Sequence, residues 1–237
     1  MKLSIVIPAY NEEAYIGKTL SAIFENATEI LFEVIVVNNA STDKTAEVAA
    51  GFSKVKVINE LQKGLTKARQ AGLNAATGDL IAYIDADTVV TKQWFAVVEE
   101  EYKKNPKLVC LSGPYYYYDI PSWQRWWVKQ WWNVARVSAN MFIHYLAVGG
   151  NFVARREALL NIGGFDTKIQ FYGEDTDIAR RLYSAGDVTF LNALTVQTSG
   201  RRILDEGLVH MGLKYAANFA SVVLFKKPVT SKYKDVR

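Results

Sequence analysis

Four short apolar runs, separated by helical patterns, constrain the fold of this chain most strongly. The strand-like runs are 3–7, 32–37, 55–58 and 80–84, of which 32–37 contains Glu33 and 55–58 contains Lys56, and the helical patterns between them are 12–26, 41–50 and 66–76. Short continuous apolar runs are typical of parallel strands that are buried on both faces. Pro8 is expected to stop the first strand. The alternation predicts an α/β fold, with a mostly parallel sheet and helices on both faces.

Length and composition favour one large domain. The chain has 237 residues, of which 50% are hydrophobic. We expect a domain over 1–203, with a change of character near residue 110, and an amphipathic, basic tail over 204–237. Residues 188–196 are expected to form one strand. Cys110 is the sole cysteine, which excludes a disulfide framework, a thiolate metal cluster and a CxxC redox motif.

The net charge of +4 is modest, and the basic residues gather near the C-terminus. They are Lys226, Lys227, Lys232, Lys234 and Arg237. This favours a membrane surface over nucleic acid as partner. We expect no span of the about 18 to 20 apolar residues that cross a bilayer, because charged residues such as Lys214 interrupt the candidates. With no leader in the sequence, we expect a cytoplasmic location, with contact at the inner face of the membrane.

Asp85 and Asp87 directly follow the apolar run 80–84. Alternate residues at a strand end can point into one crevice, and ligands of open α/β sheets bind beyond the carboxyl ends of the strands. Two carboxylates suit Mg²⁺ or Mn²⁺, which in turn can hold a diphosphate. The alternative is that both aspartates cap a helix or form a solvated turn.

A second acidic cluster comprises Glu174, Asp175 and Asp177, ahead of a helical pattern. One of these carboxylates could deprotonate an acceptor hydroxyl. The alternative is structural, because a helix N-terminus stabilises acidic side chains without catalysis.

Four motifs in order carry a family resemblance. They are SIVIPAYNEE at 4–13, VIVVNNASTDKT at 34–45, YIDADT at 83–88, and GGFD followed by YGEDTDIARRL. Together they resemble the family 2 glycosyltransferases with the GT-A fold, over residues 3–185. The resemblance implies an inverting, hexosyltransferase-type enzyme of cell-envelope polysaccharide synthesis. It also implies a nucleotide-sugar-binding half over 1–110 and an acceptor-binding half over 111–203.

The resemblance also implies residue roles on the donor side. The matching residues are Pro8, Ala9, Tyr10, Asn11, Glu12, Asn39, Lys63 and Arg69, together with Asp85, Ala86 and Asp87. Asn39 departs from the more frequent aspartate, which leaves the base open between a UDP-sugar and a GDP-sugar. Lys63 could equally belong to a solvated helix face.

In the same resemblance, Asp87 and Asp85 hold Mg²⁺ or Mn²⁺, and Asp175 serves as base beside Glu174. Arg201 and Arg202 could clamp the leaving diphosphate, or could be surface arginines. They stand where processive members carry a QxxRW motif, so its absence disfavours a processive enzyme. Gly150 and Asn151 match a turn on the acceptor side, although the glycines could merely supply tight backbone geometry.

Trp123 and Trp127 share a helical face within an aromatic-dense stretch. Three interpretations stand: core packing, a platform that stacks an acceptor sugar, and a belt at a membrane interface. The basic C-terminus favours the membrane, and a glycan or lipid-linked acceptor would follow. Two other functions compete: a nucleotidyltransferase, which PAYNEE does not favour, and an inactive nucleotide-sugar-binding subunit.

Overall fold

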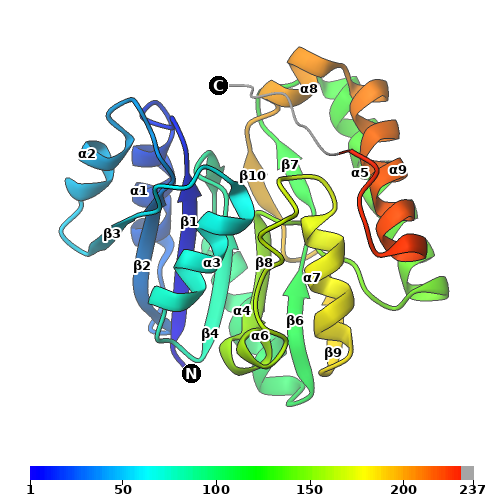
Figure 1. The fold of residues 1–237 in the computed structure, drawn as a ribbon, viewed down its shortest axis with the longest axis horizontal. Coiled ribbons are helices and arrows are strands. Elements are labelled where there is room, and N and C mark those ends of the chain that lie inside the picture. The colour runs from blue at the N-terminus through cyan, green and yellow to red at the C-terminus, as the bar shows by residue number, and fades with distance from the viewer. Residues whose placement is uncertain (231–237) are drawn as a thin grey trace.

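The structure is a computed structural model that describes residues 1–230, apart from the side chain of residue 140. A central sheet runs through the molecule (Figure 1) in the order β3-β2-β1-β4-β8-β6-β9. Its strands are β1 (Leu3–Ala9), β2 (Leu31–Asn38), β3 (Val55–Asn59), β4 (Leu80–Ile84), β6 (Leu108–Ser112), β8 (Asn151–Arg155) and β9 (Asp187–Phe190). Only β8 runs against its neighbours, so the sheet is mostly parallel, as the sequence predicts.

A smaller, separate sheet has the order β5-β10-β7. Its strands are β5 (Thr88–Val89), β10 (Val196–Thr198) and β7 (Tyr115–Tyr117). The single strand expected over 188–196 is wrong, because β9 and β10 belong to different sheets. A turn at Leu191–Leu194 separates them, closed by the hydrogen bond from Leu194 N to Leu191 O.

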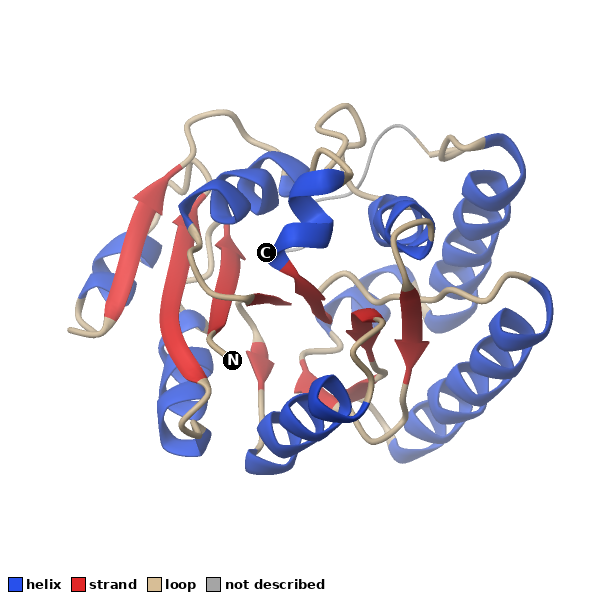
Figure 2. Cartoon of the chain, turned by 90° about the horizontal axis from the view of Figure 1, so that it is seen from below, coloured by secondary structure: helices blue, strands red, loops and turns tan. Residues whose placement is uncertain are grey.

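The helices cover both faces of the central sheet (Figure 2). They are α1 (Ile16–Asn26), α2 (Thr45–Ala50), α3 (Leu65–Ala75), α4 (Lys92–Lys104), α5 (Ser122–Phe142), α6 (Arg156–Asn161), α7 (Glu174–Tyr183), α8 (Arg201–Glu206) and α9 (Leu208–Phe225). Helices α1, α2 and α4 pack on one face, and α3, α6 and α7 on the other.

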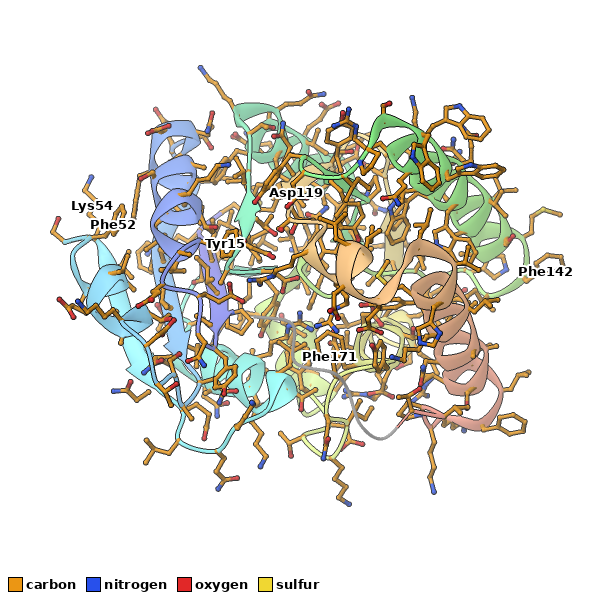
Figure 3. All side chains as sticks on the ribbon, turned by 90° about the horizontal axis from the view of Figure 1, so that it is seen from above. Tyr15, Phe52, Lys54, Asp119, Phe142 and Phe171 are labelled. Atoms are coloured by element: carbon orange, nitrogen blue, oxygen red, sulfur yellow. The ribbon has the colours of Figure 1, made fainter. Side chains whose placement is uncertain are left out.

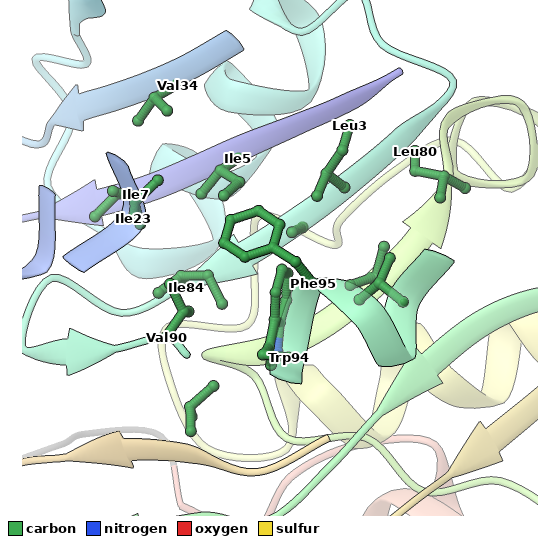
Figure 4. Packing of buried hydrophobic residues seen from close by; sticks show 14 of the residues in the cluster. Leu3, Ile5, Ile7, Ile23, Val34, Leu80, Ile84, Val90, Trp94 and Phe95 are labelled. Carbon is green, nitrogen blue, oxygen red and sulfur yellow. The ribbon is translucent and has the colours of Figure 1, made fainter. Parts of the chain in front are cut away.

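Trp94 and Phe95 of α4 anchor the first of these cores (Figure 4). Their rings are 5.1 Å apart, edge to face, and both side chains are fully buried. Along β1, Ile5 and Ile7 point into this core while Val6 points into the other. This two-sided burial explains why β1 reads as a continuous apolar run.

Two expected element limits are wrong for local reasons. Strand β1 continues through Pro8 to Ala9 instead of stopping at Pro8. Its pairing with β4 ends at Val6, so the missing N–H of Pro8 removes no bond on that side. Helix α2 begins at Thr45 rather than near residue 41, where the helical pattern starts, and the carboxylate of Asp43 accepts the N–H of Thr45.

The C-terminal helices pack onto the same domain. The tail boundary expected at residue 204 falls inside α8, and Ile203 shares a small core with Val128 of α5 and Met211 of α9. Helix α9 is also long and apolar enough to cross a membrane by length and composition. The expectation that Lys214 rules out such a stretch is therefore wrong for α9. Lys232, Lys234 and Arg237 lie outside the described residues.

Candidate active site

The site lies at the carboxyl edge of β1, β2 and β4. Asp85 and Asp87 follow β4, and residues 10–12 follow β1. The backbone of Asn11 has a left-handed φ of 53°, and its side-chain oxygen accepts the N–H of Thr42 at 2.8 Å. This bond ties the loop after β1 to the loop after β2. Parallel strands therefore bring separate sequence motifs to one edge.

Arg69 of α3 joins the two acidic motifs. Its guanidinium lies 3.4 Å from Asp85 Oδ1 and is paired with Glu174 Oε1 at the start of α7. The other oxygen of Asp85 accepts the hydroxyl of Tyr115 at 2.7 Å. Burial alone would lower the pKa of Arg69, but the charges of Glu174 and Asp85 raise it above its ordinary value. The cation is therefore fixed between the two carboxylates.

Gly149 and Gly150 pack directly against the side chains of the Arg69 ion-pair network. A Cβ on Gly149 would collide with Glu174 Oε1 and the guanidinium of Arg69. A Cβ on Gly150 would collide with the carboxylate of Asp85 and the hydroxyl of Tyr115. The glycines are required here for close approach of the backbone to charged side chains, rather than for an unusual φ.

Asp87 is held by a different set of groups. Its Oδ1 accepts the hydroxyl of Thr198 at 3.1 Å, and its Oδ2 lies 3.1 Å from the guanidinium of Arg201. Arg201 also pairs with Glu12 at 2.6 Å. Burial raises the pKa of Asp87 to about 7, against the opposing effect of Arg201. Arg201 thus places a positive charge between the acids of two loops.

The three acids of α7 have different surroundings. Glu174 is buried against Arg69, and burial raises its pKa to about 7. Asp177 makes ion pairs with Arg180 and Arg181 of its own helix at 2.9 and 2.8 Å, which is a structural role. Asp175 is half-buried and accepts the N–H and hydroxyl of Thr176.

Asp175 has the environment that suits a base. Burial raises its pKa, which the N–H of Thr176 opposes. Within residues 1–230, its carboxylate makes no ion pair within 4 Å. It is also more exposed than Glu174.

A small pocket opens at the carboxyl ends of β1 and β2, against the start of α3. It is lined by Pro8, Ala9, Tyr10, Asn39, Lys63, Leu65, Ala68 and Phe171. The ammonium of Lys63 lies 3.8 Å from the ring centroid of Tyr10. Phe171, labelled in Figure 3, lies under the guanidinium of Arg202 at 4.7 Å. Aromatic faces beside cations suit a flat base joined to an anionic diphosphate.

Asn39 shapes the wall of this pocket. Its amide nitrogen donates to the carbonyls of Glu60 and Gln62 at 3.2 and 2.9 Å, and its oxygen accepts the N–H of Gly64 at 2.8 Å. An aspartate could not donate to the two carbonyls. The departure from the more frequent residue therefore has a structural reason, which is to hold the loop 60–64.

Several predicted site residues lie elsewhere. The side chain of Ala86 belongs to the core, and its carbonyl accepts the hydroxyl of Thr19. Asn151 is fully buried, donating to Leu194 O and accepting from the indole of Trp94. Its side chain therefore links β8 to α4 and to the loop that precedes β10.

Trp123 and Trp127 are 60% and 57% exposed on the outer surface of α5. Core packing is therefore the wrong interpretation for these two residues. The interpretations as sugar platform and as membrane belt both need this exposure.

Asp85 and Asp87 fit a metal in one specific way. Within residues 1–230, no group of three or more His, Cys, Asp and Glu side chains is placed to hold a metal ion. Mg²⁺ is commonly held by one or two carboxylates and completed by substrate phosphates and water. Asp87 already binds a cation, the guanidinium of Arg201. Two carboxylates at one sheet edge have the chemistry for a metal ion that a bound diphosphate would complete, and the metal would have to share Asp87 with Arg201.

Tyr115, Thr198 and Phe171 contact the site, and the motifs in the sequence do not predict this. Tyr115 and Thr198 reach it because β7 and β10 pair in the small sheet. Phe171 stands just ahead of the acidic cluster of α7, and this proximity was an available signal.

Comparison with known proteins identifies the family. The model described as Glycosyl transferase family 2 matches residues 4–163, which is more than half of the chain. The chain therefore belongs to glycosyl transferase family 2, and the resemblance noted in the sequence is confirmed. It is similar to the uncharacterized glycosyltransferase EpsJ of Bacillus subtilis, with 31% identity over 117 residues. The match covers 48% of this chain and 34% of that protein.

Solved structures confirm the GT-A fold. A mannosyltransferase of Pyrobaculum calidifontis, solved with GDP-Man and Mn²⁺, matches with a TM-score of 0.69 and 22% identity, over 91% of this chain and 64% of that chain. TarS of S. aureus, residues 1–349, was solved with UDP-GlcNAc. It matches with a TM-score of 0.66 and 18% identity, over 84% of this chain and 58% of that chain. These neighbours bind donors with different bases.

Proposed function

We propose that this chain transfers a sugar from a nucleoside-diphosphate donor to an acceptor hydroxyl, with inversion at the anomeric carbon. The observation that carries the proposal is the meeting of two acidic motifs around Arg69, beside a pocket with aromatic and cationic walls. Family membership and nucleotide-sugar complexes of two neighbours support it.

The donor base and ribose bind in the pocket between Tyr10, Lys63 and Phe171. The diphosphate extends towards Asp85 and Asp87, where bound Mg²⁺ or Mn²⁺ would neutralise charge that grows on the leaving group. Arg201 lies next to Asp87 and supplies a second positive charge to the same oxygens. A UDP-sugar and a GDP-sugar both remain candidates, as the two neighbours illustrate.

Asp175 takes the proton from the acceptor hydroxyl. The new bond from the hydroxyl oxygen to the anomeric carbon forms as the bond to the diphosphate breaks, and the diphosphate leaves with the electron pair. Glu174 and Arg69 position this reaction and hold the edge of the site rigid. The acceptor is a glycan or lipid-linked molecule at the cytoplasmic side of the cell membrane, and transfer is non-processive.

The test is release of nucleoside diphosphate from UDP- and GDP-sugars in the presence of Mn²⁺. Asp175→Asn should lower turnover by at least about a hundredfold while nucleotide affinity changes little. Glu157→Gln, which alters an exposed acid on α6, is the matched control and should keep full turnover. A wild type that binds nucleotide without turning over any donor or acceptor would instead support the inactive-subunit alternative.

A further inference from the structure

An apolar stripe covers the outer surface of α5. Its members recur at intervals of three, four and seven residues, which places them on one side of the helix. They are Trp123, Trp126, Trp127, Trp131, Val134, Val137 and Met141, all between 46% and 65% exposed. Phe142 ends the stripe with 76% exposure, at the edge of the molecule in Figure 3. Isolated exposed apolar residues are ordinary, but a contiguous stripe marks an interaction surface.

Helix α9 carries a second apolar stripe beside the first. Its large exposed members are Val209, Leu213 and Leu224, and Phe225 follows at the end of the helix. The inner faces of the two helices pack together, with Val128 and Met211 in one small core. Figure 1 places α5 and α9 at the same end of the molecule. We call the outer surface of these two helices the α5/α9 face.

The charge of this face has a single sign. Neither α5 nor α9 contains an aspartate or a glutamate. Arg125, Lys129 and Arg136 lie on α5, and Lys226 and Lys227 follow α9 and are exposed. The charged residues within the two helices are therefore all basic, and Lys214 of α9 is paired with Glu206 of α8.

We propose that the α5/α9 face docks on the surface of a bilayer that contains anionic lipids. Tryptophan prefers the headgroup region of a membrane, and basic residues beside an apolar helix face attract anionic headgroups. A second copy of the chain fits less well, because two such faces would bring like charges together. The helices lie in the interface, and α9 keeps its packing on the domain.

This docking would place the site close to the membrane. The ring of Tyr215 on α9 lies 5.3 Å from that of Tyr172, and Val222 of α9 packs next to Gly173. Tyr172 and Gly173, which α9 contacts, immediately precede Glu174 and Asp175 in the chain. One helix, about 10 Å across, therefore separates the proposed base from the bilayer. An acceptor carried by a membrane lipid is then within reach, an inference that rests on the proposed function.

The test measures binding of the full chain to sedimented vesicles of phosphatidylcholine with and without phosphatidylglycerol. Wild type should bind the anionic vesicles, with a blue shift of tryptophan emission, and more weakly in 0.5 M salt. The double variant Trp126→Glu with Trp127→Glu should bind at least about tenfold more weakly. Leu160→Glu, at an exposed leucine of α6, is the control and should bind as wild type does.

Nucleotide binding by each variant in solution shows that it is folded, so failure of docking and failure of the proposed function are distinguishable. Three results would overturn the proposal. They are absence of vesicle binding by wild type, binding that the double variant retains, and a dimer in solution that the double variant dissociates. Resistance of bound wild type to alkaline extraction would also contradict it, because α9 would then be inserted.

Discussion

The guanidinium of Arg69 is paired with the carboxylate of Glu174, and both side chains are almost entirely buried, at 1% and 6% exposure. The same guanidinium lies 3.4 Å from Asp85. Arg69 thus sets the distance between the acidic pair after β4 and the acidic cluster of α7. A buried ion pair that loses one member leaves an uncompensated charge, whereas an exposed pair does not.

Arg69→Ala should therefore lower the free energy of unfolding by about 3 to 5 kcal/mol. Arg69→Lys keeps the positive charge but loses the planar guanidinium that can contact two carboxylates. It should therefore lower the free energy of unfolding less than Arg69→Ala does. Urea unfolding measures both. The control is Lys103→Ala, which removes an exposed partner of Glu99 and should change stability little. Equal losses for Arg69→Ala and Lys103→Ala would show that the network does not stabilise the fold.

Gly150→Ala should damage the site by collision. The new methyl group would overlap the carboxylate of Asp85 and the hydroxyl of Tyr115. We expect a loss of about 1 to 3 kcal/mol in stability and weaker metal-dependent nucleotide binding. Gly212→Ala on α9 is the control, because its Cβ would meet open space. Unfolding curves and calorimetry measure the two effects, and a Gly150→Ala protein with unchanged nucleotide affinity would be evidence against the close packing described.

Asn39→Asp introduces the acidic residue that the family resemblance leads one to expect, yet it should weaken this protein. The change removes both donors to the carbonyls of Glu60 and Gln62 and sets a carboxylate against them. Buried groups left without partners cost about 1 to 3 kcal/mol each. Thermal unfolding should show the loss, and calorimetry should show altered nucleotide affinity as the loop shifts. A variant as stable as wild type would mean that Asn39 does not hold this loop.

The sequence predicts the part of the fold that depends on local pattern. Buried runs and helical spacing locate β1 to β4 and α1 to α3, and their order along the chain predicts that Asp85 lies at a sheet edge. The pairing of distant segments is not encoded locally. Insertion of β8 between β4 and β6 buries Asn151, and pairing of β10 with β7 brings Thr198 to Asp87. Neither consequence could be predicted from the residues alone.

Glu174 should make stability depend on pH. Burial raises its pKa from the ordinary 4.5 to about 7, against the pull of Arg69. The folded chain thus binds this proton more tightly than the unfolded chain. The contribution to stability is complete below pH 4.5 and is lost as the pH rises through 7.

The loss should be at most about 3 kcal/mol. Glu174→Gln should remove this part of the pH dependence. Urea unfolding at pH 5 and pH 8 tests this prediction. An equal change in the free energy of unfolding between the two pH values for wild type and Glu174→Gln would refute the assignment to Glu174.

The proposed function requires a metal-dependent donor site at Asp87 and its neighbours. Calorimetric titration of UDP, GDP, TDP and CDP with Mn²⁺ or Mg²⁺ into wild type and Asp87→Ala tests it most directly. We predict saturable binding of one nucleotide that requires the metal and is lost in Asp87→Ala. Binding that is indifferent to metal and to Asp87, or no binding of any nucleotide, would contradict the account.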